Sequence, residues 1–417
     1  MNVSVLPEDC RPADAELFIN PNARRFSEWS ARQDAVLSRE GFRTAEAVIH
    51  HWPGYRKTPL VSLDGLAALM GVERVWYKDE AKRFGLKSFK ALGGAYAIAQ
   101  LILREAGRHC RGLPISSPLL FAGKYQGLAA DITVASATDG NHGRSVAWGA
   151  KLFGCKAVIY IHATVSEGRR RAIEAYGAEV RRVDGNYDDS VRQCAADAAE
   201  HGWTVISDTS YPGYMEIPVD VMQGYGVMAA EAIAQLPPDE EPTHVFVQGG
   251  VGGMAAAVAA HIAWRWKRKC PMLIVVEPER AACLLASAKA GGPTTIGGDL
   301  DTVMAGLSCG EPSLLAWEVL QEAGDAFMAI PDHAAEATMR LLARGQGRDR
   351  PLVAGESGVA GLAGAITASQ VQELRTKLSL NRHSRVLVFG TEGATDPELY
   401  EEIVGRSAED VEAEAAE

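Results

Sequence analysis

The sequence predicts an α/β protein in which parallel sheets are covered by helices on both faces. Past residue 50, short β-branched runs alternate with alanine-rich stretches of helical period, an order typical of parallel sheets with crossover helices. The runs are almost continuously apolar, as in strands buried on both faces. At 417 residues the chain is too long for one core, since domains average roughly 150 residues. We expect a large domain at 1–90 and 216–417 and a small domain at 91–215.

Each predicted strand is a short run of β-branched and aromatic residues, such as RVWYK, AVIYI or HVFVQ. The strands are expected at 74–78, 131–135, 157–161, 203–207, 244–248, 272–276, 326–330 and 385–389. Each predicted helix is a longer stretch with apolar residues three and four positions apart. The helices are expected at 88–107, 143–153, 166–176, 187–201, 219–235, 254–267, 313–322, 333–344 and 358–377. A loop is expected at 112–127, and the acidic tail AEDVEAEAAE should be a solvated helix end or a frayed terminus.

Composition and charge exclude several classes of protein. Lys and Arg total 42 against 53 Asp and Glu, a net charge of −11, which repels the phosphate backbone of nucleic acids. The seven cysteines form no CxxC pair, so we expect no metal site and a reducing compartment. The N-terminus lacks the apolar core of a signal peptide. We therefore expect a cytoplasmic protein that acts on a small molecule, with neither nucleic acid nor a membrane as partner.

A glycine-rich turn, QGGVGG, interrupts the uncharged stretch 244–264. The stretch is long enough to cross a membrane, but its glycines would break a spanning helix, so we predict a strand, a turn and a helix. Backbone N–H groups of such a turn, with the helix N-terminus, suit a phosphate. The predicted phosphate-binding residues are Gly249, Gly250, Val251, Gly252 and Gly253. Two alternatives stay open, an unliganded tight turn and a dinucleotide site in which Gly250, Gly252 and Ala255 fit G-x-G-x-x-A and Glu277 binds the ribose.

A basic and aromatic segment, YKDEAKRFGLKSFKALGG, runs into an alanine-rich helix and places Lys90 in its first turn. The positive end of the helix and neighbouring cations would disfavour the ammonium form there. A lysine with a lowered pKa is the group that Schiff-base chemistry requires. The alternative is an ordinary solvated lysine.

A polar turn between a strand and a helix, SATDGNHGRSVAWGA, is the third candidate. Amides at the start of the helix could hold a carboxylate, with Thr138 and Asn141 as neutral donors. The alternative is structural, because Asp139 and Gly140 form an ordinary turn pair and His142 could cap the helix.

The late strand VLVFG ends in Thr391, Glu392 and Gly393. Ligands of doubly wound sheets bind at the carboxyl ends of the strands, so Thr391 could meet a cofactor ring. A hydroxyl there, unlike a carboxylate, would not force protonation of a ring nitrogen. The alternative is a local turn stabilised by the threonine hydroxyl.

Taken together and in this order, the four segments resemble those of pyridoxal-phosphate enzymes of the tryptophan synthase β-subunit type, called fold type II. The matches are Ser88, Phe89 and Lys90 for the S-F-K lysine motif, Asn141 for the ring-contacting asparagine, and Gly249 to Gly253 for the phosphate loop. The likeness runs from about Lys57 to Pro397. It implies a two-domain α/β fold, a homodimer, and pyridoxal 5′-phosphate bound by Lys90, Asn141, the loop and Thr391.

Within fold type II, the phrases RFGLKSFKALGGAYA, ATDGNHGRSVAWGAKLFG, DTSYPGYMEIP and GTEGATDPELYEEIV are similar to those of the diaminopropionate ammonia-lyases. That resemblance implies α,β-elimination of D- and L-2,3-diaminopropionate to pyruvate and two ammonia. It places Asp139 and Asp208 in the pocket, where carboxylates would favour a second, cationic amine. Lys90 would take the α-proton from the L-isomer and Asp139 from the D-isomer. The implied substrate-binding residues are Thr138, Asp139, Gly140, Asn141 and His142.

Three other functions stay open at this stage. A related enzyme would dehydrate a β-hydroxy amino acid such as serine, threonine or hydroxyaspartate, although those dehydratases usually have a serine where this chain has Asp139. An NAD-dependent dehydrogenase would use Gly250, Gly252 and Glu277. A noncatalytic nucleotide-binding module would use the same turn. The dehydrogenase interpretation leaves Lys90 and the turn at 136–150 without a role.

Overall fold

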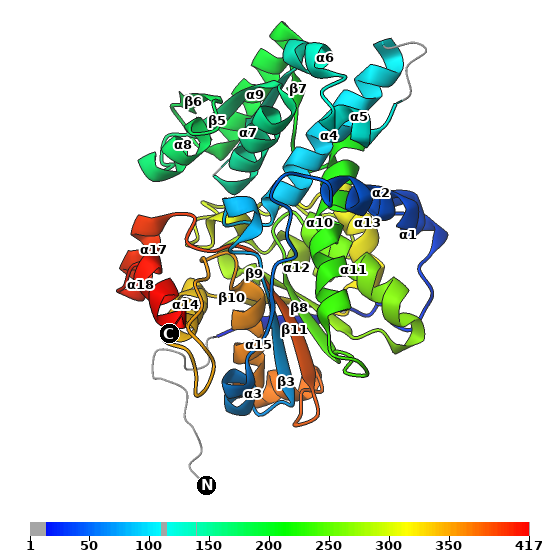
Figure 1. The fold of residues 1–417 in the computed structure, drawn as a ribbon. Coiled ribbons are helices and arrows are strands. Elements are labelled where there is room, and N and C mark those ends of the chain that lie inside the picture. The colour runs from blue at the N-terminus through cyan, green and yellow to red at the C-terminus, as the bar shows by residue number, and fades with distance from the viewer. Residues whose placement is uncertain (1–13, 110–114, 139, 417) are drawn as a thin grey trace. The chain divides into compact units, whose positions relative to one another are not determined.

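The protein was analysed as a computed structural model that describes residues 14–109, 115–138 and 140–416, and these fall into two compact units (Figure 1). The larger unit comprises Met1–Val36, Lys57–Ser88 and Met228–Glu417, and the smaller comprises Leu37–Arg56 and Phe89–Val227. The boundaries expected from the sequence, 1–90 with 216–417 and 91–215, stay a prediction of where the folding domains end.

A seven-stranded sheet forms the centre of the larger unit, in the order β1-β10-β9-β8-β11-β3-β2. The five inner strands are parallel, whereas β1 and β2 pair antiparallel at the two edges. The strands are β1 (Glu16–Ile19), β2 (Leu60–Ser62), β3 (Arg74–Asp79), β8 (His244–Gln248), β9 (Met272–Pro278), β10 (Ala326–Ile330) and β11 (Arg385–Gly390). Because β3, β8 and β11 are neighbours, their carboxyl ends bring Asp79, Gln248 and Gly390 to one edge of the sheet.

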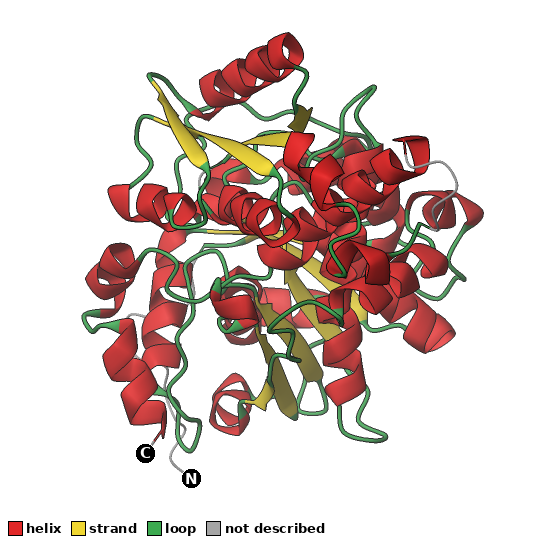
Figure 2. Ribbon diagram, turned by 45° about the horizontal axis from the view of Figure 1, so that its top comes forward, coloured by secondary structure: helices red, strands yellow, loops and turns green. Residues whose placement is uncertain are grey.

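Helices lie around this sheet, as Figure 2 shows in red beside the yellow strands. The main core packs α3, α14 and α15 against alternate residues of the inner strands, among them Phe246, Ile274 and Val388. The helices of this unit are α1 (Ala31–Val36), α3 (Asp64–Met70), α11 (Gly253–Trp266), α12 (Cys283–Ala290), α13 (Leu314–Ala323), α14 (Asp332–Arg344), α15 (Ala360–Gln370), α16 (Gln372–Lys377), α17 (Pro397–Val404) and α18 (Ala408–Ala416). The acidic tail is thus mostly helical.

The smaller unit has a four-stranded parallel sheet in the order β6-β5-β4-β7. The strands are β4 (Thr133–Ala137), β5 (Lys156–His162), β6 (Glu179–Val183) and β7 (Thr204–Val205). On β5, Ile159 meets Gly143 of α7, whereas its neighbour Val158 clusters with Cys194 of α9. Successive strand residues point to opposite faces, so α7 and α9 cover opposite faces of this sheet.

The helices of the smaller unit are α2 (Arg39–Ile49), α4 (Lys90–His109), α5 (Ser117–Phe121), α6 (Gln126–Asp131), α7 (Asn141–Phe153), α8 (Glu167–Glu174) and α9 (Tyr187–His201). Helix α10 (Glu216–Gln235) begins in this unit and ends in the larger one. Small residues allow close packing between helices. A Cβ at Gly94 of α4 would lie 2.1 Å from Oγ of Ser145 on α7, and one at Gly224 of α10 would lie 2.2 Å from the carbonyl oxygen of Leu92.

Several predicted elements are wrong in their limits. The strand expected at 131–135 lies at 133–137, because α6 continues to Asp131. The strand expected at 203–207 is only Thr204–Val205. Of the loop expected at 112–127, residues 112–114 lie outside the described residues, and the rest contains α5 and the start of α6. The helix expected at 358–377 is two helices, because Val371 adopts an extended conformation between them. The sequence reasoning also missed β1, β2 and β6.

The stretch 244–264 forms β8, a glycine turn and α11, so its predicted strand, turn and helix are confirmed. Across the described ranges, every helix is too short or too polar to cross a membrane.

Candidate active site

Lys90 is the first residue of α4 in the smaller unit. Its Nζ lies 2.5 Å from Oδ2 of Asp208, which follows β7. Each side chain keeps 18% of its surface exposed, so solvent and small molecules can reach both. The sequence reasoning expected cations beside this amine, whereas the structure places a carboxylate there.

The Asp208 carboxylate is kept ionised by its neighbours. Burial raises its pKa, but the Lys90 ammonium and His142 lower it more strongly, so the net pKa lies well below the usual range of an aspartate. His142 Nδ1 lies 3.8 Å from the same carboxylate oxygen. The structure thus brings Lys90, His142 and Asp208 together, although 118 residues separate Lys90 from Asp208.

The imidazole of His142 is buried, and burial lowers its pKa. Its Nε2 lies 2.9 Å from the carbonyl oxygen of Ile206. A carbonyl oxygen can only accept, so in the neutral ring the hydrogen lies on Nε2 and Nδ1 carries a lone pair. The Nδ1 lone pair faces Asp208 and suits a proton or a donor hydrogen.

The turn between β4 and α7 holds the other predicted substrate-binding residues. Thr138 Oγ1 accepts hydrogen bonds of 3.0 Å from the backbone N–H groups of Gly140 and Gly143, and so caps the start of α7. Asn141 is the first residue of that helix. Asp139 lies outside the described residues.

Two aromatic rings lie beside the Lys90 amine, of which the sequence reasoning named Phe89 only as part of the S-F-K motif and missed Tyr225. The ring centroids of Phe89 and Tyr225 lie 5.5 Å and 5.6 Å from Lys90 Nζ. Tyr225 belongs to α10 and is almost fully buried, and burial raises its pKa. Phe89 adjoins Lys90 in sequence and could have been inferred, but only the fold brings Tyr225 to it.

The glycine turn of the larger unit connects β8 to α11. Gly250 and Gly252 adopt left-handed conformations with φ of 64° and 95°, which glycine tolerates best. A Cβ at Gly249 would lie 2.4 Å from Cγ of Glu277, so that position also requires glycine. The first N–H groups of α11, which begins at Gly253, have no acceptor within the helix. The turn therefore offers donors and a positive helix end to an anion.

Thr391 lies just after β11 in the same unit and is 4% exposed. Its Oγ1 accepts a 3.1 Å hydrogen bond from Nε2 of Gln248, the residue immediately before the glycine turn. Gln248 thus connects two predicted cofactor-binding elements, and the sequence reasoning did not single it out.

The segment that leads to Lys90 is anchored in the larger unit by buried charges. Arg83 forms hydrogen bonds of 2.8 Å to both carboxylate oxygens of Glu80 and of 2.9 Å and 2.8 Å to those of Glu231. Lys78 Nζ lies 2.7 Å from Glu231. Farther along, Gly393 N–H donates to the carbonyl oxygen of Lys87. In the sequence this segment is a run of charged residues, and the run shows neither that these side chains are buried nor which residues they pair with.

Comparisons with known proteins identify the family of this chain. Residues 51–391 match the family described as pyridoxal-phosphate dependent enzyme. The diaminopropionate ammonia-lyase of Escherichia coli K12 is 44% identical over 356 residues, which cover 84% of this chain and 88% of that protein. The chain belongs to the pyridoxal-phosphate dependent enzyme family.

A second relative and a solved structure are also similar to this chain along most of their length. The diaminopropionate ammonia-lyase of Salmonella typhimurium LT2 is 39% identical over 366 residues, which cover 85% of this chain and 90% of that protein. The crystal structure of the Escherichia coli enzyme in complex with an aminoacrylate-PLP azomethine reaction intermediate has a TM-score of 0.85 and 39% identity. That match covers 96% of this chain and 98% of the other. The predicted fold type II architecture is confirmed by these likenesses.

The donors of this pyridoxal-phosphate dependent enzyme fit the cofactor of its family. The glycine turn presents helix-end N–H groups that suit a phosphate. Thr391 has a buried hydroxyl whose oxygen already accepts a hydrogen bond, which leaves its hydrogen for an acceptor such as a ring nitrogen. Lys90 supplies a reachable primary amine.

Glu277 excludes the dinucleotide-binding alternative. Its carboxylate is fully buried and accepts 2.8 Å hydrogen bonds from the backbone N–H groups of Leu284 and Leu285. It therefore caps α12 from behind the glycine turn and does not reach a ribose. Burial raises its pKa to about 8.

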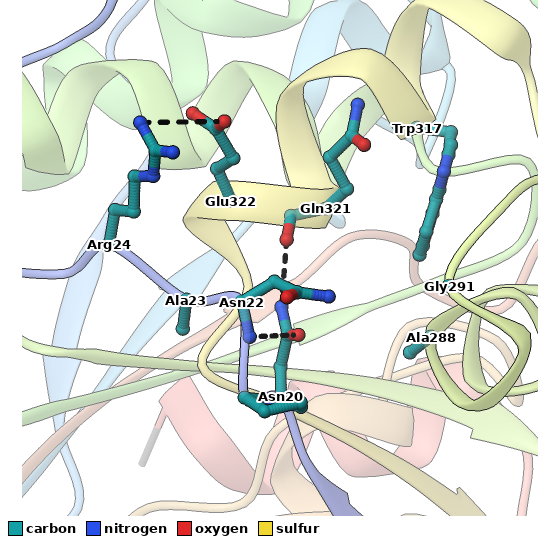
Figure 3. A pocket seen from close by; sticks show the side chains of 10 residues that line it. Asn20, Asn22, Ala23, Arg24, Ala288, Gly291, Trp317, Gln321 and Glu322 are labelled. Atoms are coloured by element: carbon teal, nitrogen blue, oxygen red, sulfur yellow. Dashed lines mark hydrogen bonds and ion pairs between the residues drawn. The ribbon is translucent and has the colours of Figure 1, made fainter.

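A separate pocket of the larger unit, of about 510 Å³, contains none of the predicted site residues (Figure 3). Asn20 donates to the carbonyl oxygens of Gln321 and Gly324 at 2.9 Å and 2.8 Å and accepts from the N–H of Asn22 at 3.0 Å. These bonds fasten the segment after β1 to the end of α13. The polar groups that contact Asn20 in this pocket thus hold two segments of the fold together.

Proposed function

We propose that this pyridoxal-phosphate dependent enzyme is a diaminopropionate ammonia-lyase. It converts D- or L-2,3-diaminopropionate and one water to pyruvate and two ammonia. The observation that carries the proposal is the reachable ion pair of Lys90 and Asp208, which combines the amine that binds the cofactor with a carboxylate suited to a cationic substrate. The names of relatives 44% and 39% identical to this chain support the same substrate.

Four parts of the chain hold the cofactor in this proposal. Lys90 would bond it through Nζ, the glycine turn would bind its phosphate, Asn141 would contact its ring, and Thr391 would donate to its ring nitrogen. When bound, pyridoxal 5′-phosphate supplies an electron sink for the negative charge that develops at the substrate α-carbon.

Proton removal from the α-carbon requires a base on the side from which the proton leaves. We assign this role to the Lys90 amine for the L-isomer and to Asp139 for the D-isomer. The second assignment rests on the sequence resemblance and explains how one chain would accept both enantiomers.

The two ends of the substrate need opposite charges. Thr138, Gly140, Asn141 and His142 lie at the start of α7, where the helix N-terminus supplies backbone N–H groups and Asn141 a neutral side chain for the substrate carboxylate. Asp208 binds an ammonium already in this structure and suits the cationic β-amine. Two opposite charges 4 Å apart gain about 4 kcal/mol at an effective dielectric of about 20, before desolvation is subtracted. Serine has a hydroxyl at that position and lacks this attraction.

The stoichiometry of the products tests this function. Pyruvate and ammonia are measured with separate coupled enzymes during turnover of 2,3-diaminopropionate and, in parallel, of serine and threonine. We expect two ammonia per pyruvate and a much higher kcat/KM for the diamine. A preference for a β-hydroxy amino acid, with one ammonia per keto acid, would identify a dehydratase instead.

A chemical label tests the role of Lys90. Borohydride should bleach the yellow protein and fix the cofactor to a tryptic peptide that contains Lys90. A colourless protein that binds NAD, with no labelled peptide, would contradict the proposed function.

Asp139→Asn tests the two-base assignment. We expect turnover of the D-isomer to fall far more than that of the L-isomer, because only the D-isomer depends on that carboxylate. Asp188→Asn, at an exposed position of α9, is the matched control and should leave both rates unchanged. Equal losses for the two isomers would contradict the assignment.

We further propose a cytoplasmic homodimer with domains at 1–90 with 216–417 and at 91–215. The scattered cysteines support a reducing compartment, and the resemblance to fold type II enzymes supports the dimer. Sedimentation of the holoenzyme gives its mass directly, and a monomer would refute the dimer.

A further inference from the structure

Gln248 lies at the end of β8 with its amide turned into the protein. The side chain is 1% exposed. Its Nε2 lies 2.6 Å from the carbonyl oxygen of Gly358, 2.7 Å from that of Phe389 and 3.1 Å from Oγ1 of Thr391. The two carbonyl oxygens fix the orientation of the amide, because carbonyls can only accept and the opposite orientation would place Oε1 against both. The two N–H hydrogens of Nε2 are shared among the three oxygens, of which Thr391 Oγ1 is the most distant. Gln248 Oε1 is buried, and among the described residues it has no hydrogen-bond partner. The hydrogen bonds that Nε2 donates therefore determine how the amide is oriented.

This arrangement determines what the hydroxyl of Thr391 can do. Its oxygen faces an N–H donor and accepts, so its hydrogen must point elsewhere. In the described part of the chain, Thr391 donates to no acceptor, although a buried donor without an acceptor costs about 1–3 kcal/mol. Thr391 is therefore built to donate to a group that the chain itself does not supply.

The acceptor for that hydrogen must carry a lone pair. An unprotonated pyridine nitrogen has one, whereas a protonated pyridinium would place one donor against another. The carboxylate of Glu392, next in the chain, accepts from the N–H groups of Ser357 and Gly358 at 2.8 Å and 3.2 Å. Its Oε1 is thereby directed to the 357–358 backbone.

We propose that Gln248 is a positioning residue that fixes Thr391 as a hydrogen-bond donor and so keeps the ring nitrogen of the bound cofactor unprotonated. Gln248 does not touch the cofactor and acts through the hydroxyl of Thr391. This inference rests on the proposed function, because it takes Thr391 to be the residue opposite the ring nitrogen.

The test measures the ring nitrogen itself. The apoprotein is reconstituted with ¹⁵N-labelled pyridoxal phosphate, and the ¹⁵N resonance is recorded for the natural protein, Gln248→Met and Thr391→Val. In the natural protein we expect the resonance of an unprotonated, hydrogen-bonded pyridine. Both variants should move it to the same new position, and the double variant should add nothing further. Gln235→Met, a substitution at another glutamine of the larger unit, is the matched control and should leave the resonance unchanged.

A second readout is the affinity of each apoprotein for pyridoxal phosphate. Loss of this hydrogen bond should weaken binding about tenfold in both variants, which equals about 1.4 kcal/mol. The Thr391→Val variant decides the matter even where Gln248→Met does not fold, since an unchanged resonance in Thr391→Val overturns the inference. An unchanged resonance in folded Gln248→Met, or a pyridinium resonance in the natural protein, also overturns it. Failure of the natural protein to bind the cofactor at Lys90 would instead refute the proposed function.

Discussion

Lys78 and Lys90 lie twelve positions apart in one charged segment, and each pairs with a carboxylate, yet their exposure to solvent differs. The Lys78 side chain is completely buried, and Nζ donates to the carbonyl oxygen of Thr58 at 2.6 Å, to Glu231 at 2.7 Å and to Gln235 at 2.8 Å. The Lys90 side chain pairs with Asp208, and both keep 18% of their surface exposed.

The difference shows how the same amino acid becomes structural in one place and reactive in another. An ammonium has three N–H donors, and Lys78 uses all three on oxygens of the chain, so it has no hydrogen left for a ligand. Lys90 stands at the accessible start of a helix, beside a carboxylate that a substrate amine can also use. Access, rather than an acidic partner, separates the two lysines.

Replacing the reactive lysine should have the largest effect on activity. We expect Lys90→Ala to reduce kcat by at least about 10³-fold, because the variant loses both the cofactor attachment and the base for the L-isomer. The midpoint of thermal unfolding of the apoprotein should change little, since the side chain is partly exposed. Lys82→Ala, at an exposed position of the same segment, is the control. A Lys90→Ala variant that keeps most of its turnover would contradict the view that Lys90 is the reactive lysine and Lys78 the structural one.

Breaking the buried charge network should have the largest effect on stability. Glu231→Gln keeps the shape of the side chain but leaves Lys78 and Arg83 with less negative charge to face. Breaking a buried ion pair costs about 3–5 kcal/mol, and urea unfolding of the apoprotein should show a loss of this size. Glu216→Gln, an exposed position of the same helix, should change the free energy of unfolding by less than about 1 kcal/mol. If Glu231→Gln also lost less than about 1 kcal/mol of unfolding free energy, water would be replacing the ion pairs that Glu231 forms with Lys78 and Arg83.

The fold class could be predicted because local patterns determine it. The inner strands of the larger sheet are rich in β-branched, aromatic and other apolar residues, and those at 244–248 and 326–330 lie where the sequence reasoning placed them. The edge strands could not be predicted in this way. Strand β6 contains Arg181 and Arg182 and is only half buried, as edge strands often are, so its sequence resembles a polar loop. Only tertiary pairing with β5 makes it a strand.

Side-chain geometry at the site could be predicted only in part. Lys90 at a helix start and the glycine turn follow from local sequence. The approach of Asp208 to Lys90, and that of Gln248 to Thr391, join positions more than a hundred residues apart. No periodicity encodes such pairs, and only the family resemblance pointed to Asp208. Nothing pointed to Gln248, because a single glutamine at the end of a strand carries no signal without its acceptors.

Replacing the partner of each lysine sharpens the comparison. Asp208→Asn should reduce kcat/KM for 2,3-diaminopropionate by about 10²-fold, because the pocket loses the carboxylate that attracts the second amine. It should change the free energy of unfolding by only about 1 kcal/mol, since solvent reaches the pair. Steady-state kinetics and urea unfolding on one preparation measure both. A loss of stability as large as that expected for Glu231→Gln would show that the two ion pairs are alike.

The smallest effect is expected from acid, and it is specific to the buried network. Burial raises the pKa of Glu231, but Arg83 and Lys78 lower it more strongly, to about 2 against an unperturbed 4.5. Between these values the unfolded chain binds a proton that the folded chain does not. The stabilising contribution is therefore present above pH 4.5 and is lost as the pH falls towards 2. The slope is at most about 1.4 kcal/mol per pH unit.

Glu231→Gln removes this titration, so the difference in unfolding free energy between the natural protein and the variant should shrink as the pH is lowered from 4.5. Urea unfolding at pH 4.5, 4.0 and 3.5, values chosen from the onset of that range, measures the difference directly. Asp208→Asn, in the smaller unit, is the control and should leave the contribution of Glu231 intact. A difference that stays constant over this range would show that Glu231 is not held ionised by the two cations, and that the network owes its stability to packing instead of charge.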